Sequence, residues 1–133
     1  MTKGFVGDIK KAAKENDFFR RVLFTGKSSQ LVLMSLEPGE DIGAEVHSVD
    51  QIIYVVDGEG MVELDGDKKE FEKGDVVFVP AGVRHNVVNS EDKEAMKLFT
   101  VYAPPQHADG TIHPTKADAE AAEAKPLAAT FGA

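Results

Sequence analysis

Between Arg21 and Ala103 the chain is a succession of short apolar runs separated by glycine, proline, aspartate and asparagine. Runs such as RVLFT, QLVLMSL, QIIYVV and DVVFV are too short for typical helices and are rich in β-branched residues, as strands are. We count about eight such runs, the number found in small antiparallel sandwiches and barrels. The sequence therefore predicts an all-β fold.

The run from Gln51 to Val56 shows how these strands are arranged. Every position after Gln51 is apolar, so both faces of a strand formed there need cover, and we predict that it lies between two layers. Further along, Asp65 and Gly66 interrupt a charged stretch, and both tolerate a positive φ. A tight hairpin is predicted at that point, and a closed barrel or a sandwich accommodates both features.

A short helix is predicted on each side of the sheet region. Asp8 is a suitable N-cap for a helix over about residues 8–16. Thr115, followed three residues later by Asp118, resembles a capping box and predicts a helix over about residues 115–124. These helices add to the all-β core without changing its class.

The 133 residues fit one domain. We place the core barrel at about 21–103 and treat 104–133 as a tail, in which the sheet pattern stops after Pro105. The last residues, from Pro126 onward, are expected to fray unless Phe131 docks on the core. The prediction is thus a single domain over 1–133.

The composition of the chain limits the classes of binding partner that we expect. The formal net charge of -8 disfavours nucleic acid and anionic membranes, and we expect neither as a partner. The absence of cysteine excludes thiolate metal sites and disulfides, and it suits a reducing compartment. No segment has the length or apolarity of a signal peptide or membrane span, so a cytoplasmic location is expected.

Four residues with side chains able to bind metal occur at constrained positions. Glu45 and His47 are two apart and would project to one face of a strand, where Gln51 can join them from the next strand. His85 begins a later strand, directly after a turn that contains Pro80 and Gly82. We predict that His85 meets the other three from across the barrel.

The spacing of these residues resembles the cupin superfamily. Its first motif reads G, five residues, H-x-H, three or four residues, E, six residues, G; this chain keeps the spacing but carries Glu45 for the first His and Gln51 for the Glu. The second motif is G, five residues, P-x-G, two residues, H, three residues, N. That motif is complete in Gly74, Pro80, Gly82, His85 and Asn89.

The resemblance implies a jelly-roll barrel, also called a double-stranded β-helix, with one divalent metal ion in its lumen. The ligands would be Glu45, His47, Gln51 and His85, because the two exchanges together preserve both the number of donors and the net charge. Mannose-6-phosphate isomerases have a similar set of ligand types, although Glu and Gln stand in the opposite order here. Zn²⁺, Mn²⁺, Fe²⁺ and Ni²⁺ all suit such donors. The alternative is a hydrogen-bonded polar cluster without a metal.

The resemblance leaves the reaction open, because one fold serves many activities. We expect a metal-dependent enzyme acting on a small sugar-like or oxygenated metabolite, by isomerase, epimerase, lyase or dioxygenase chemistry; Glu45, if it is not a ligand, would be the nearest catalytic base. The alternative is a non-catalytic module that binds or senses a small ligand. We also expect a homodimer, formed through excess apolar strand surface.

Other polar residues have weaker functional expectations. His107 and His113 are expected to be solvated imidazoles of the tail; a lid over the site is the alternative. Arg84 could meet an anionic substrate at the mouth of the barrel or form a surface ion pair. Asn89 is expected to bond backbone groups. Tyr54, Phe78, Tyr102 and Met34 are expected to pack in the core.

Overall fold

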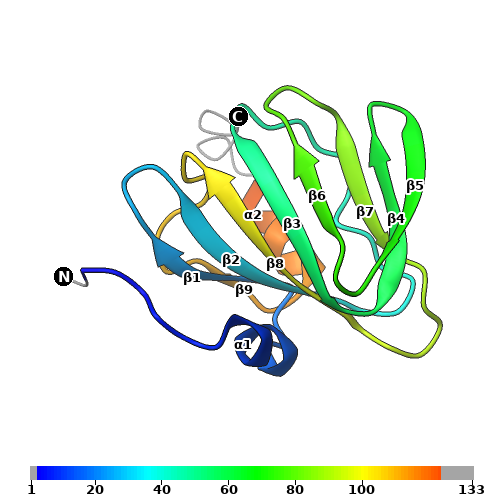
Figure 1. Cartoon of the computed structure of the whole chain (residues 1–133), viewed down its shortest axis with the longest axis horizontal. Coiled ribbons are helices and arrows are strands. Elements are labelled where there is room, and N and C mark those ends of the chain that lie inside the picture. Colours follow the sequence, from blue (N-terminus) through cyan, green and yellow to red (C-terminus); the bar gives the residue numbers. More distant parts are fainter. Residues whose placement is uncertain (1–2, 124–133) are drawn as a thin grey trace.

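The computed structural model describes residues 3–123 and folds them into two antiparallel sheets that face each other (Figure 1). The larger sheet has the strand order β6-β3-β8-β2-β1-β9, and the smaller one has the order β5-β4-β7. The strands are β1 (Arg20–Thr25), β2 (Gln30–Leu36), β3 (Asp50–Asp57), β4 (Glu59–Leu64), β5 (Asp67–Glu72), β6 (Val76–Val79), β7 (His85–Asn89), β8 (Met96–Ala103) and β9 (Ile112–His113). This is the expected jelly-roll barrel.

The core lies between the two sheets. Along β8, buried and half-buried residues alternate, as they do when one face of a strand points inward. The central residues of this core come from both sheets: Val32, Met34, Leu36, Ile53, Val55, Val62, Val87, Met96 and Leu98. The hairpin between β4 and β5 turns at Asp65 and Gly66, both at positive φ, as the sequence predicts.

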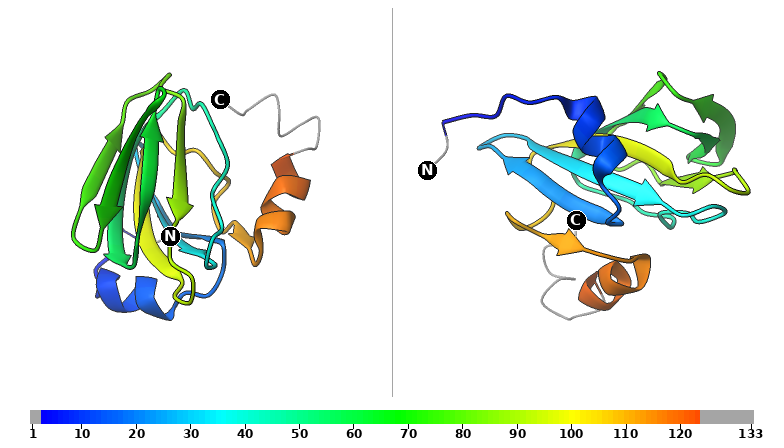
Figure 2. Two further views of the ribbon diagram at one scale, coloured as in Figure 1. Left: turned by 90° about the vertical axis from the view of Figure 1, so that its right-hand side faces the viewer. Right: turned by 90° about the horizontal axis from the view of Figure 1, so that it is seen from below.

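Both predicted helices are present, on opposite sides of the larger sheet (Figure 2). Helix α1 (Ile9–Glu15) begins after Asp8, whose side chain accepts a hydrogen bond from the Lys11 N–H at 3.1 Å. Helix α2 (Lys116–Glu123) begins after Thr115, where the hydroxyl group of Thr115 and the carboxylate of Asp118 bond each other's backbone N–H groups. Both N-cap predictions are confirmed.

The sequence-based expectation is wrong for two segments. Residues 43–47 form no strand; the segment makes only an isolated bridge to His85 at Glu45. The sheet pattern does not end at Pro105, because Ile112 and His113 return as β9 and pair with β1. Each error concerns a segment whose pairing partner lies far away in the sequence. Pro126 and Phe131 lie outside the described residues.

The outer face of the larger sheet is only partly covered. Helix α1 packs over Leu33 and Val56, so the predicted two-sided burial of β3 holds at its end. Towards β6 the outer face is open: Val76 is 63% exposed and Phe78 is 54% exposed. The expectation that Phe78 packs in the core is therefore wrong. No helix within residues 3–123 is long and apolar enough to cross a membrane.

Candidate metal centre

The segment around Glu45 is held against β7, although it is not a strand. The Glu45 N–H donates to the His85 carbonyl and the His85 N–H donates to the Glu45 carbonyl, both at 2.9 Å. The Gly82 N–H donates to the His47 carbonyl at 2.8 Å, which joins the turn of the second motif to the first. These backbone bonds bring together residues that are about 40 positions apart.

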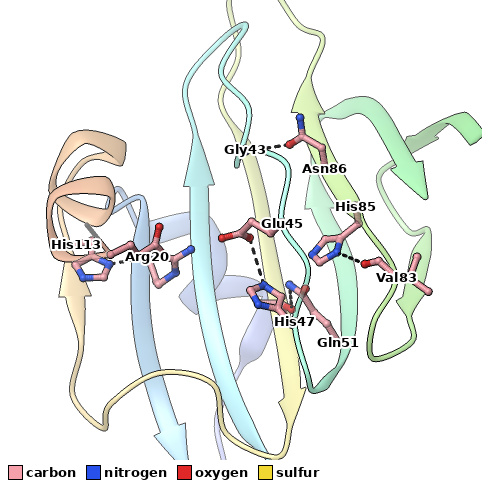
Figure 3. A network of polar contacts seen from close by, with 11 residues as sticks. Arg20, Gly43, Glu45, His47, Gln51, Val83, His85, Asn86 and His113 are labelled. Atoms are coloured by element: carbon pink, nitrogen blue, oxygen red, sulfur yellow. Dashed lines mark hydrogen bonds and ion pairs between the residues drawn. The ribbon is translucent and has the colours of Figure 1, made fainter. Parts of the chain in front are cut away.

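The structure brings Glu45, His47 and His85 together. One potential ligand atom from each lies within 4.8 Å of the others, which is a separation that a single bound cation can span. His47 Nε2 is 3.3 Å from Glu45 Oε1 but lacks the geometry of a hydrogen bond (Figure 3). The two imidazole rings are buried, with centroids 5.2 Å apart. Such a cluster can hold a metal ion.

The backbone carbonyl of Val83 orients the ring of His85. Its Nδ1 atom lies 2.9 Å from the Val83 carbonyl, which accepts a hydrogen bond when Nδ1 carries the proton. Nε2 is then left as a free acceptor, and it has no hydrogen-bond partner. Burial lowers the pKa of His85, while the Val83 carbonyl opposes this shift. A neutral imidazole with a fixed tautomer is the form that binds metals.

Gln51 faces the interior from β3, and its amide is oriented by Thr100. The Gln51 Nε2 group donates to Thr100 Oγ1 at 3.1 Å. Its carbonyl oxygen is buried and has no partner. An amide oxygen is a metal ligand, and this one is left free by the same hydrogen bond that holds the side chain.

Buried polar atoms without a hydrogen-bond partner are concentrated in this part of the barrel. Among residues 3–123 there are six such side-chain atoms. Four belong to predicted ligands: both nitrogens of His47, the Gln51 oxygen and His85 Nε2. The other two are Arg20 Nε and His107 Nε2. Because such atoms are costly and rare in proteins, their concentration makes this interior the candidate binding site.

Three residues near the cluster were missed or misplaced in the sequence analysis. Tyr102 is buried as expected, but its ring also contacts the His47 ring edge-on, with the ring centroids 5.8 Å apart. The His107 ring also contacts the Tyr102 ring edge-on, with the ring centroids 5.1 Å apart. Burial lowers the pKa of His107 to about 3. Its expected solvation is therefore wrong. His113 is half-buried, and its Nδ1 lies 3.3 Å from Nη1 of the buried Arg20.

The burial of Arg20 is consistent with its position in the sequence. It alternates with Val22 along β1, and both are buried while the residue between them is exposed. Arg84, which the sequence offered instead as an anion contact, is exposed.

Asn89 has the structural role that the sequence predicts. Its amide donates to the carbonyl groups of Leu36, Glu37 and Glu94 at 2.9 to 3.1 Å. Its own oxygen accepts a hydrogen bond from the Glu91 N–H at 3.0 Å. The side chain therefore ties the start of β8 to the end of β2 and takes no part in the cluster.

Comparison with known proteins gives consistent results. The family model of the cupin domain matches residues 32–102. YrkC of Bacillus subtilis (strain 168) is 46% identical over 128 residues, covering 91% of this chain and 68% of YrkC. The crystal structure of BH2720 from Bacillus halodurans matches with a TM-score of 0.87 and 41% identity, over 90% of this chain and 95% of that one.

A more distant match is the crystal structure of a predicted oxalate decarboxylase from Thermotoga maritima. It is 26% identical, with a TM-score of 0.55, and the match covers 59% of this chain and 69% of that one. The family model spans more than half of this chain, including all four predicted ligands. The jelly roll, the motif spacing and these matches agree, and the chain belongs to the cupin family.

Proposed function

We propose that the protein is a metal-dependent enzyme that acts on a small oxygenated metabolite. The metal ligands are Glu45, His47, Gln51 and His85, and the ion is Zn²⁺, Mn²⁺, Fe²⁺ or Ni²⁺. One observation carries the proposal: Glu45, His47 and His85 each place a potential ligand atom within 4.8 Å of the others, and buried atoms of His47, His85 and the nearby Gln51 have no hydrogen-bond partner. A hydrogen-bonded cluster without metal would satisfy these atoms among themselves.

The donor set fits a divalent ion in charge as well as in position. Two neutral imidazoles and an amide contribute no charge, and Glu45 contributes one negative charge, so a bound divalent ion keeps a net positive charge. When bound, such an ion polarises a carbonyl or hydroxyl oxygen and lowers the pKa of water. The similar protein from Thermotoga maritima is described as a predicted oxalate decarboxylase, and oxalate is a small oxygenated metabolite of the proposed class.

The surrounding residues position the reacting groups. Glu45 is the carboxylate of the cluster and is partly exposed, so its second oxygen can take a proton from a bound substrate. Thr100 and the Val83 carbonyl hold Gln51 and His85 in their orientations. Tyr102 lines the interior beside His47.

A direct test loads purified protein separately with each of the four metals and incubates it with ketoses, uronates and diketones, in air and without oxygen. Product formation followed by NMR should depend on the metal and disappear in His85→Ala. Saturable binding of one of these compounds without any product would instead support the non-catalytic binding module. Turnover that persists in metal-free protein would contradict the proposal.

We also propose that two copies pair through the open outer face of the larger sheet. Val76 and Phe78 on β6 are more than half exposed and stand beside half-buried Ile52 on the neighbouring β3. An apolar strand face at the edge of a sheet suits a two-fold contact between identical chains. Phe78→Glu should therefore convert a dimer to a monomer in sedimentation, whereas Lys69→Glu on the exposed β5 should not. A wild-type monomer would contradict this assignment.

A further inference from the structure

Arg20 is a buried cation near the candidate metal centre. Its side chain is only 2% exposed, and it enters the barrel from the first position of β1. A guanidinium group removed from water needs hydrogen-bond partners for its donors and a nearby negative charge. The partners of Arg20 therefore show whether its role is structural.

These partners satisfy Arg20 incompletely. One nitrogen, Nη1, makes both a contact to His113 Nδ1 at 3.3 Å and a hydrogen bond to Glu123 Oε2 at 3.4 Å. Charge-assisted bonds between guanidinium and carboxylate are usually about 2.7 to 2.9 Å long. The Glu123 side chain is 47% exposed, and Arg20 Nε is buried with no partner. The counter-ion of Arg20 is thus distant, singly bonded and open to water.

Tyr102 connects Arg20 to the metal-ligand cluster. Burial raises the pKa of the Tyr102 phenol, and the positive charge of the Arg20 guanidinium opposes this rise. The same ring contacts the His47 imidazole edge-on. In the view of Figure 3, Arg20 lies on the opposite side of Glu45 and His47 from His85. The Tyr102 side chain is therefore a neighbour of both the guanidinium and the cluster.

We propose that Arg20 binds the carboxylate of the substrate, and that Glu123 is the exchangeable counter-ion which the substrate displaces. The planar guanidinium can bond a carboxylate through two parallel N–H groups, which would engage the free Nε. Replacing the carboxylate of Glu123 with that of a ligand leaves the charge of the interior unchanged. A phosphate dianion would add negative charge beside Glu45, so a carboxylate is favoured.

This inference rests on the proposed function and specifies its substrate class. A ligand that meets Arg20 with its carboxylate would lie beside Tyr102 and present a hydroxyl or carbonyl oxygen to the metal. The substrate is then a small hydroxy acid or oxo acid. A neutral sugar would leave Arg20 Nε buried and unpaired.

The test compares lactate with its neutral analogue lactamide, by calorimetric titration of zinc-loaded protein. Wild type should bind lactate at least about tenfold more tightly than lactamide, since a charge-assisted pair contributes that much binding free energy. Arg20→Gln should abolish this preference, and Arg20→Lys should retain only part of it. Glu123→Gln, which changes an exposed side chain and leaves the barrel intact, should raise the affinity for lactate by removing the competing carboxylate.

The outcomes separate this inference from the proposed function. Zinc content is measured on every sample, and Arg20→Gln should keep its metal because Arg20 is not a ligand. If wild type retains none of Zn²⁺, Mn²⁺, Fe²⁺ and Ni²⁺ after loading with each, the proposed function fails; if it retains one of the other three in place of zinc, the titrations are run with that metal. If it holds zinc but lactate binds no better than lactamide, or inorganic phosphate binds better than lactate, or Glu123→Gln leaves lactate affinity unchanged, the Arg20 assignment is overturned.

Discussion

Two buried amide side chains in this barrel, Asn89 on β7 and Gln51 on β3, have opposite hydrogen-bond patterns. Asn89 donates to three carbonyl groups and accepts from a fourth residue. Gln51 makes one bond, to Thr100, and its oxygen has no partner. Both residues belong to sequence motifs with fixed spacing, and both are buried. Burial therefore does not separate a structural amide from one that is available to bind a ligand, whereas the hydrogen bonding of its oxygen does.

The largest effect on stability is expected for Asn89→Ala. One buried and two partly buried carbonyls and one N–H would lose their partner, which should lower the free energy of unfolding by about 4 kcal/mol. Asn86→Ala is the matched control on the same strand; Asn86 is half-buried and bonds only Asp41 and Gly43, so about 1 kcal/mol is expected. Urea unfolding measures both. Equal losses would break the contrast between the two kinds of amide.

A smaller effect is expected from pH, through His107, whose Nε2 is unpartnered like the Gln51 oxygen. Because burial lowers its pKa to about 3, the folded protein resists a proton that the unfolded chain accepts below about pH 6.5. Stability should thus fall as pH drops through 6.5, by about 2 kcal/mol between pH 7.5 and 5. His107→Asn should flatten this slope in chelator-treated protein. An unchanged slope would show that His107 is solvated.

The smallest effect on stability is expected for Gln51→Met, which removes the unpartnered oxygen and keeps the volume. The metal-free protein should change by less than about 1 kcal/mol, because only the bond to Thr100 is lost. Its metal affinity should fall about tenfold, as water replaces the amide oxygen. Gln51→Glu should do the reverse and bind metal more tightly. A destabilisation of Gln51→Met as large as that of Asn89→Ala would assign Gln51 a structural role.

Much of the fold could be predicted from the sequence, because its determinants are local. The caps at Asp8 and Thr115 and the hairpin at Asp65 and Gly66 each depend on residues within a few positions. The spacing of the cupin motifs also predicts that Glu45, His47 and His85 form one group, as they do in the structure. The local pattern and the family spacing were sufficient for these features.

The remaining features depend on pairings between distant segments. Residues 43–47 look like a strand in sequence but make only one bridge, to His85, which lies 40 positions away. The tail returns and pairs with β1 through β9, and this pairing covers Arg20 and places His107 beside Tyr102. Nothing local to either residue encodes that return. The sequence therefore predicted the candidate metal ligands, but it did not predict which residues surround them.

The metal content of the purified protein tests the central claim most directly. Wild type and Asn89→Ala should each carry about one divalent ion per folded chain by elemental analysis, since Asn89 is not a ligand. The double variant His47→Ala, His85→Ala should be nearly metal-free, because imidazole is the strongest donor type in the set. Equal metal in wild type and the double variant would contradict the site, and with it the proposed mechanism.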